Sequence, residues 1–161
     1  MSSRQPLLLC IDDDPQTLDV RRMLLENQGF SVLTAGGGRE GLEKFQAHRV
    51  DAVICDYQMP EMDGGQVAQA IKHARPKVPV MILSALPFLP EDAPDCIDAF
   101  VTKGEPTAFL VAKINQMMGA PAVPKPPSSW MPNFGFSQGE TARPRRTRRG
   151  FGHHALGFNG S

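Results

Sequence analysis

Short apolar runs alternate with segments of helical periodicity over the first two thirds of the chain. The runs are four or five residues long, as expected of buried strands, and occupy residues 7–11, 31–34, 52–55, 80–83 and 99–102. Between them lie helix signals, among them Asp14-Pro15 as a cap with a first turn and Pro106 before the last segment. Strands that alternate with helices in this way predict right-handed βαβ units and one parallel sheet.

The fourth connection departs from this pattern. Residues 86–96 contain Pro87, Pro90 and Pro94, and a helix interior accommodates none of them without losing a hydrogen bond and creating a steric clash. We therefore expect a loop, or at most one or two helical turns, between the fourth and fifth strands.

Charged or hydroxyl residues stand where four of the predicted strands end. Residues 12–14 are three aspartates after the first strand, and Asp56, Ser84 and Lys103 follow the third, fourth and fifth. The carboxyl ends of parallel strands meet at one edge of a sheet, which is where open α/β folds bind their ligands. These side chains are therefore expected to lie close together.

Such a set suits a Mg²⁺ ion and a phosphoryl group. Asp56 is the candidate nucleophile, and Asp12 and Asp13 supply the hard oxygen ligands that Mg²⁺ prefers. Ser84 can donate a hydrogen bond to a phosphoryl oxygen, and Lys103 can pair with it. The simpler interpretation of an acidic run, a helix cap, fits Asp14 but leaves the other two aspartates unexplained because a cap needs only one acid.

In this order and spacing, these segments resemble the receiver domain of two-component response regulators. The matching segments are LCIDDDP at 9–15, DYQMP at 56–60, MDG at 62–64, SA at 84–85 and FVTK at 100–103. The resemblance covers about residues 6–118 and implies a flavodoxin-like α/β fold. That fold is a five-stranded parallel sheet of order 2-1-3-4-5 with helices on both faces, here with a shortened or irregular fourth helix.

The resemblance also assigns a metal site. Asp56 would be the phosphoacceptor. Mg²⁺ would be bound directly by Asp13, by Asp56 and by the main-chain carbonyl of Gln58, with Asp12 acting largely through water.

A switch is implied as well. Ser84 and Phe100 would form the switch pair, and Lys103 would contact the phosphoryl group. The chain departs from the family pattern after this lysine, because Gly104 stands where the family usually has proline.

The implied function is that of a stand-alone response regulator that catalyses only its own phosphorylation and dephosphorylation. It would accept its phosphoryl group from a histidine kinase or phosphotransfer protein and act on an unknown downstream protein. A rival enzyme class, the haloacid-dehalogenase-like phosphatases, also uses an aspartate after an apolar strand. Its opening motif needs Thr or Val at the position of Gln16, and it leaves Asp56 without a role.

The charge of the chain is divided unevenly although its formal sum is zero. Residues 1–118 hold 11 Lys or Arg against 16 Asp or Glu, whereas residues 119–161 hold 6 against 1. Pro and Gly supply 13 of the last 43 positions, too many for a packed core, so residues 119–161 are expected to be a disordered tail. Five arginines at 143–149 leave open an alternative, a degenerate receiver that serves as an adaptor or makes weak nucleic-acid contact.

The cysteines and the N-terminus indicate a cytoplasmic protein without membrane insertion. Cys10, Cys55 and Cys96 are odd in number and form no CxxC pair, which favours reduced thiols. The first two lie within strand runs and are expected to be small buried hydrophobes. The N-terminal apolar stretch is only five residues long, shorter than a signal peptide core or a membrane span.

Overall fold

The structure, a computed structural model, describes residues 4–119. Five parallel strands form one sheet of order β2-β1-β3-β4-β5, as predicted. The strands are β1 (Leu7–Ile11), β2 (Ser31–Ala35), β3 (Ala52–Asp56), β4 (Val80–Ser84) and β5 (Ala99–Thr102). The helices are α1 (Pro15–Glu26), α2 (Gly38–Ala47), α3 (Gly64–Ala74) and α4 (Thr107–Met117). The predicted tail, apart from Gly119, lies outside the described residues.

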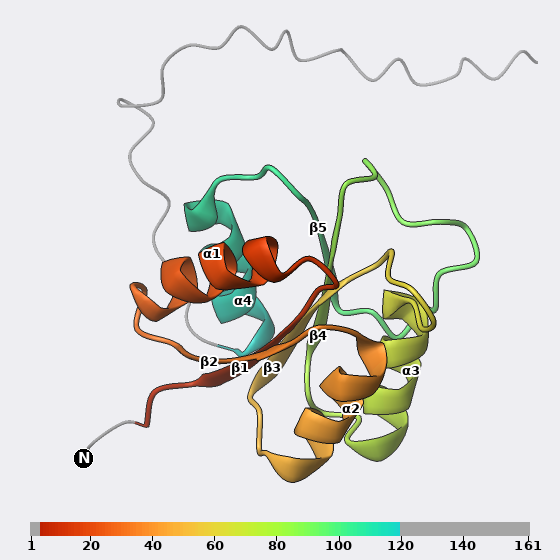
Figure 1. The fold of residues 1–161 in the computed structure, drawn as a ribbon, viewed down its shortest axis with the longest axis horizontal. Coiled ribbons are helices and arrows are strands. Elements are labelled where there is room, and N and C mark those ends of the chain that lie inside the picture. Colours follow the sequence, from red (N-terminus) through yellow and green to blue (C-terminus); the bar gives the residue numbers. More distant parts are fainter. Residues whose placement is uncertain (1–3, 120–161) are drawn as a thin grey trace, which may run out of the picture. The chain divides into compact units, whose positions relative to one another are not determined.

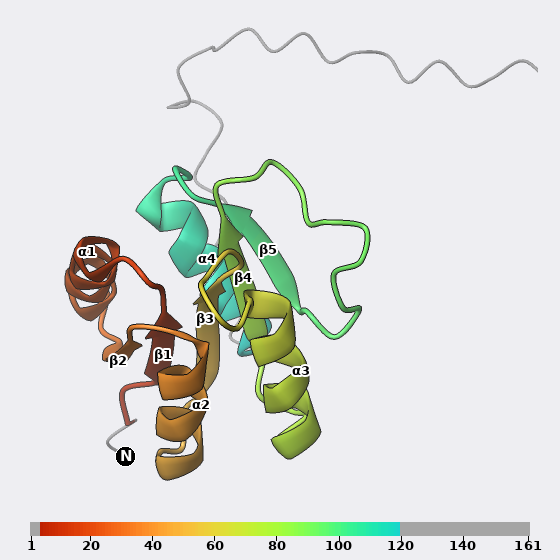
Figure 2. The same ribbon diagram turned by 45° about the vertical axis from the view of Figure 1, so that its right-hand side comes forward.

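The sheet separates two apolar layers, because alternate residues of each strand point to opposite faces. On one face, strand residues such as Ile11 and Ile82 pack against α2 and α3 through Phe45 and Ile71. On the other face, a second set of strand residues packs against α1 and α4. Figures 1 and 2 show this arrangement, with α1 and α4 on one side of the strands and α2 and α3 on the other.

Local capping explains where two helices begin. The Asp14 side chain accepts a hydrogen bond from the main-chain N–H of Gln16, and Pro15 occupies the first helical position of α1. Before α3, Asp63 and Gln66 form a reciprocal capping box. This box ends the loop that carries the chain away from Asp56, and so fixes the direction in which that loop leaves the sheet.

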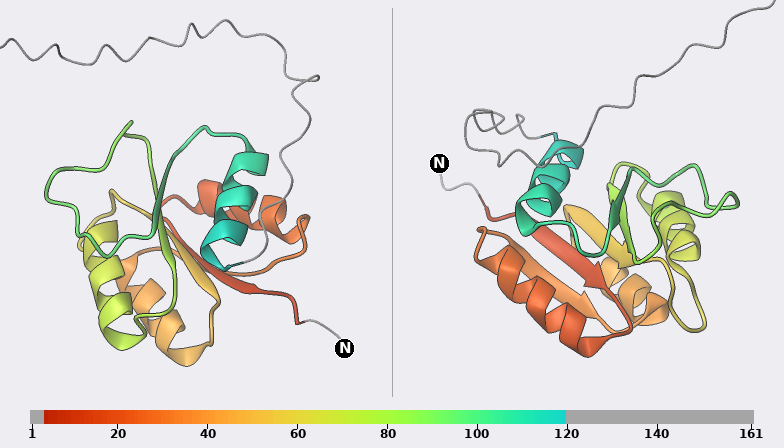
Figure 3. Two further views of the ribbon diagram at one scale, coloured as in Figure 1. Left: turned by 180° about the vertical axis from the view of Figure 1, so that it is seen from behind. Right: turned by 90° about the horizontal axis from the view of Figure 1, so that it is seen from above.

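The segment between β4 and β5 contains no helix. Residues 85–98 form a long loop, which Figure 3 shows beside α3. The prediction of a loop is therefore confirmed. The helix that the receiver fold would place between its fourth and fifth strands is absent here rather than shortened. Pro94 of this loop packs on α3, because one of its ring atoms lies 3.0 Å from the position that a Cβ would take on Gly65.

The cysteines behave as expected of small apolar residues. All three are free thiols, and Cys10 and Cys55 are fully buried in the sheet. Burial raises the pKa of the Cys10 thiol to about 12 and that of Cys55 further, so neither forms a thiolate at neutral pH. Between residues 4 and 119, no helix is long and apolar enough to cross a membrane.

Candidate functional site

Three carboxylates meet at the carboxyl edge of the central strands. Ile11 pairs with Cys55 in the sheet, which places the next residues of β1 and β3, Asp12 and Asp56, side by side. One oxygen of each of these side chains and one of Asp13 all lie within 4.8 Å of one another. Asp12 is fully buried and Asp56 is 5% exposed, whereas Asp13 is exposed to solvent.

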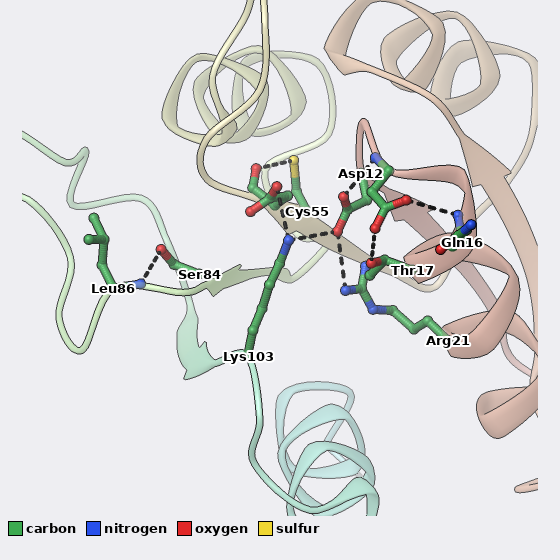
Figure 4. Close-up of polar contacts among 10 residues, drawn as sticks. Asp12, Gln16, Thr17, Arg21, Cys55, Ser84, Leu86 and Lys103 are labelled. Atoms are coloured by element: carbon green, nitrogen blue, oxygen red, sulfur yellow. Dashed lines mark hydrogen bonds and ion pairs between the residues drawn. The ribbon is translucent and has the colours of Figure 1, made fainter.

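Lys103 joins two of the carboxylates. Its Nζ lies 3.0 Å from Oδ2 of Asp12 and 3.0 Å from Oδ2 of Asp56, with the lysine side chain 29% exposed. Figure 4 shows the ammonium group beside Asp12, with the lysine side chain extending from the end of β5. The predicted convergence of residues from the first, third and fifth strands is therefore present in the structure.

The ionisation of the cluster reflects burial and crowding of like charges. Burial raises the pKa of Asp56, and the neighbouring charges of Asp12 and Asp13 act in the same direction, while Lys103 partly opposes them. Burial by itself would lower the pKa of Lys103, but its bonds to the two carboxylates outweigh that effect and raise it. The lysine therefore stays charged, and the ionised form of Asp56 is less favourable than that of a free aspartate.

The donor set fits a hard cation. The cluster offers carboxylate oxygens, the ligand type that Mg²⁺ prefers, and three acids so close together repel one another unless positive charge lies between them. Asp13 faces solvent and pairs with no cation in the described part of the chain, so its oxygens are available. When bound, Mg²⁺ would supply positive charge for phosphoryl oxygens.

Gly64 determines how closely the following loop can pack beneath Asp56. A Cβ at this glycine would lie 2.4 Å from the main-chain oxygen of Asp56 and 2.9 Å from Cα of Tyr57. Its N–H donates to the carbonyl of Tyr57 at 2.8 Å. The start of α3 is thus held directly against the end of β3, which fixes the position of Asp56.

Gly104 explains the departure from the family pattern after the lysine. Its φ is +111°, in the left-handed region that residues with a side chain rarely adopt. Proline, whose φ is confined to about −65°, could not take this conformation. The connection from β5 to α4 therefore passes through a conformation that proline cannot adopt, and Lys103 reaches the carboxylates.

Ser84 and Phe100 form no hydrogen bond or ion pair with the cluster. The hydroxyl of Ser84 accepts the N–H of Leu86 at 3.1 Å and is 2% exposed (Figure 4). Phe100 is half-buried and packs against the apolar layer that faces α2 and α3. Gln58 is exposed two residues after Asp56, and the use of its carbonyl as a metal ligand stays a prediction.

Arg21 is a buried residue that the sequence pattern did not predict. Thr17, Val20 and Leu24 stand at helical spacing, but Val20 and Leu24 are 55% and 40% exposed. The inner face instead holds Leu18, Leu25 and, between them, Arg21, whose Nη2 lies 3.3 Å from Oδ2 of Asp12. The one signal in the sequence was that this arginine lies three residues after one leucine and four before the other.

A comparison with known protein families identifies the domain. The model of the response regulator receiver domain matches residues 8–114, most of the described chain and all of the cluster. The chain belongs to the response regulator receiver family. It is thus a module of phosphorelay signalling in two-component systems.

Relatives include receivers of two kinds of protein. The chain is 42% identical over 91 residues to the transcriptional regulatory protein GlrR of Escherichia coli K12, which is 56% of this chain and 20% of that protein. It is 40% identical over 91 residues to the sensor histidine kinase GacS of Pseudomonas protegens, or 53% of this chain and 10% of the kinase. The receiver thus spans a fifth or less of these relatives.

Solved receivers have the same fold. The response regulator TrrA of Thermotoga maritima, crystallised with Mg²⁺-BeF, is 26% identical with a TM-score of 0.67, covering 70% of this chain and 99% of TrrA. A receiver domain protein of Clostridium thermocellum is 29% identical with a TM-score of 0.65, covering 71% of this chain and 94% of that one. TrrA has also been solved in complex with the histidine kinase ThkA.

Proposed function

We propose that Asp56 of this receiver accepts a phosphoryl group from a phosphohistidine, with Mg²⁺ held by the neighbouring carboxylates. A carboxylate oxygen of Asp56 forms the new bond to phosphorus, and the bond from phosphorus to the imidazole nitrogen breaks. The imidazole nitrogen keeps that electron pair, and an acyl phosphate remains on the receiver. Such a transfer depends mainly on positioning and on charge stabilisation, which is what this cluster offers.

The geometry favours Asp56 over its neighbours as the acceptor, because a nucleophile must be both held and reachable. Asp12 is fully buried and already engaged by Lys103, Arg21 and the N–H of Asp14. Asp13 is reachable but is paired with neither Lys103 nor Arg21. Asp56 combines slight exposure with an ammonium group 3.0 Å from its oxygen, and this observation carries the assignment.

Lys103 would stabilise the charge of the phosphoryl group, and the acids would hold Mg²⁺. The ammonium of Lys103 already pairs with two carboxylate oxygens at the site. It can therefore pair with a phosphoryl oxygen once the negative charge has moved from Asp56 to the phosphoryl group. Asp12, Asp13 and the Gln58 carbonyl would hold Mg²⁺ together with Asp56. The receiver would act only on its own phosphorylation and dephosphorylation, with a histidine kinase or phosphotransfer protein as its donor.

The switch would act through the loop at residues 85–98 in place of a helix. Ser84 now accepts the N–H of Leu86 in this loop, and its hydroxyl can instead turn toward a new phosphoryl group. That movement would release Leu86 and change the packing around Phe100, because Leu89 and Ile97 of the same loop pack on the apolar layer that Phe100 joins. The loop also carries Phe88, 72% exposed, on the surface that would change.

Labelling with acetyl phosphate and Mg²⁺ tests the acceptor. We expect the intact mass of the wild type to rise by one phosphoryl group, lost again in hydroxylamine, and the Asp56→Asn variant to stay unlabelled. Asp95→Asn, the same change at an exposed loop position, should label like the wild type. Equal labelling of the wild type and Asp56→Asn would refute the assignment and point to Asp12 or Asp13.

A further inference from the structure

Arg21 is a buried cation that takes no part in the proposed phosphotransfer. Its side chain is 8% exposed, and it lies on the inner face of α1 between Leu18 and Leu25. Nη2 forms an ion pair with Asp12, whose side chain has no exposed surface. Nη1 is also buried and has no hydrogen-bond partner in the described part of the chain.

Stability alone does not explain this arginine. Removing a guanidinium from water is costly, and an unpaired buried donor adds to the cost. An apolar side chain at the same place would extend the leucine stripe of α1 onto the sheet, and such replacements of buried ion pairs are often neutral or stabilising. A role at the carboxylate cluster is therefore the better explanation.

Arg21 occupies an acceptor position on Asp12 that the water of a hydrated cation could otherwise use. A carboxylate offers about four lone-pair positions. On Asp12, Oδ2 accepts from Lys103 at 3.0 Å and from Arg21 at 3.3 Å, and Oδ1 accepts the N–H of Asp14 at 3.1 Å. About one position is left for a water molecule of a hydrated cation.

Arg21 also changes the charge that a cation meets. The three carboxylates carry three negative charges, which Lys103 alone would reduce to two and which Lys103 with Arg21 reduce to one. The guanidinium acts at short range in a buried setting, where salt and water screen its charge poorly.

We propose that Arg21 is a positioning residue that holds Asp12 against Lys103 and lowers the affinity of the cluster for Mg²⁺. The inference rests on the proposed function, because that function assigns Mg²⁺ to these acids. Arg21 touches neither the phosphoryl group nor Asp56; it acts through Asp12. Its effect is on metal binding before any phosphoryl donor arrives, so it can be measured without one.

Calorimetric titration of the full chain with MgCl₂ tests the proposal. Arg21→Met keeps an unbranched side chain of similar length and removes the charge. We expect it to bind Mg²⁺ at least tenfold more tightly than the wild type. Arg22→Met is the matched control, because Arg22 is the next residue of α1, is 49% exposed and pairs with Asp19 away from the cluster. Its Kd should stay within twofold of the wild-type value.

Two further variants separate charge from packing. Arg21→Lys retains a positive charge and should keep the weak wild-type affinity, which a merely structural role would not predict. Arg21→Gln is neutral but still able to bond Asp12, and should bind more tightly, so it replaces the methionine variant if that protein fails to fold. Thermal melts establish which variants are folded.

Asp13→Asn separates a failure of the Mg²⁺ site from a failure of the role of Arg21. If it abolishes Mg²⁺ binding while the neutral Arg21 variants bind like the wild type, the role of Arg21 is refuted and the proposed function stands. If Mg²⁺ binding survives Asp13→Asn unchanged, or the wild type binds no Mg²⁺ at millimolar concentration, the metal site fails and this inference fails with it. Tighter binding by both neutral variants and not by Arg21→Lys supports it.

Discussion

Replacing Asp56 with asparagine removes one of three carboxylates whose oxygens lie within 4.8 Å of one another. In the absence of Mg²⁺ and phosphoryl donor, we expect this change to raise the stability of the protein. The amide is nearly isosteric with the carboxylate, and its oxygen can still accept a hydrogen bond from Lys103. The main effect is therefore electrostatic.

The size of the gain in stability depends on opposing charge interactions of Asp56. With an effective dielectric constant of about 20, repulsion at 4.8 Å is about 3.5 kcal/mol for each neighbouring carboxylate, and water reduces the share of exposed Asp13. Attraction to Lys103 at 3.0 Å offsets about 5.5 kcal/mol. These terms nearly cancel, so the burial of the carboxylate decides the sign, as it does for the raised pKa of Asp56. We expect a net gain of about 1–2 kcal/mol.

Urea unfolding in EDTA at pH 7 measures this gain, with Asp95→Asn as the control at an exposed position. On heating, the variant should melt about 4–8 °C above the wild type, because 1 kcal/mol shifts the Tm of a domain this size by about 4 °C. Added Mg²⁺ should stabilise the wild type more than the variant and so narrow the difference. A variant that is less stable than the wild type in EDTA would show that the ionised carboxylate of Asp56 does not destabilise the fold.

The pH dependence of the same difference has a definite sign. Because the pKa of Asp56 is raised in the folded state, folding favours its protonated form. As pH falls through that raised pKa, the native wild type takes up a proton and loses the repulsion. The stability difference between wild type and Asp56→Asn should therefore shrink with falling pH and close near the ordinary aspartate pKa of about 3.9. A stability difference that widens on acidification would show that the ionised form of Asp56 is not the source of the destabilisation.

Three more predictions concern thiols, packing and the switch. A thiol reagent added to the native protein should modify Cys96 rapidly and the two strand cysteines only on unfolding, because those two are buried with raised pKa values. Gly64→Ala should cost about 2 kcal/mol in urea unfolding, since its methyl group would overlap main-chain atoms at the end of β3, whereas Gly37→Ala enters open space and should cost little. Ser84→Ala should still accept a phosphoryl group but lose the phosphorylation-dependent change in hydrogen exchange at residues 85–98; an unchanged response would show that the switch runs by another route.

Much of the fold follows from local signals in the sequence. The five apolar runs became strands within one residue of their predicted bounds, because buried parallel strands need continuous apolar side chains. The right-handed crossovers of a parallel sheet then bring the ends of those strands to one edge. The meeting of Asp12, Asp56 and Lys103 is a consequence of that topology, so it was predictable without any contact being known.

Other features depended on contacts between distant segments. Helical periodicity alone could not select the inner face of α1, because Val20 and Leu24 form as good a stripe as Leu18 and Leu25. The charge of Asp12, directly after β1, decides which face turns inward, since a fully buried carboxylate favours the face that brings Arg21 toward it. Likewise, the prolines of residues 86–96 argue against a helix, but the packing of Pro94 on α3 and the bond from Leu86 to Ser84 determine where the loop lies. Periodicity reports which residues can share a face, and the choice between two possible faces is made by the free energy of the whole packed structure.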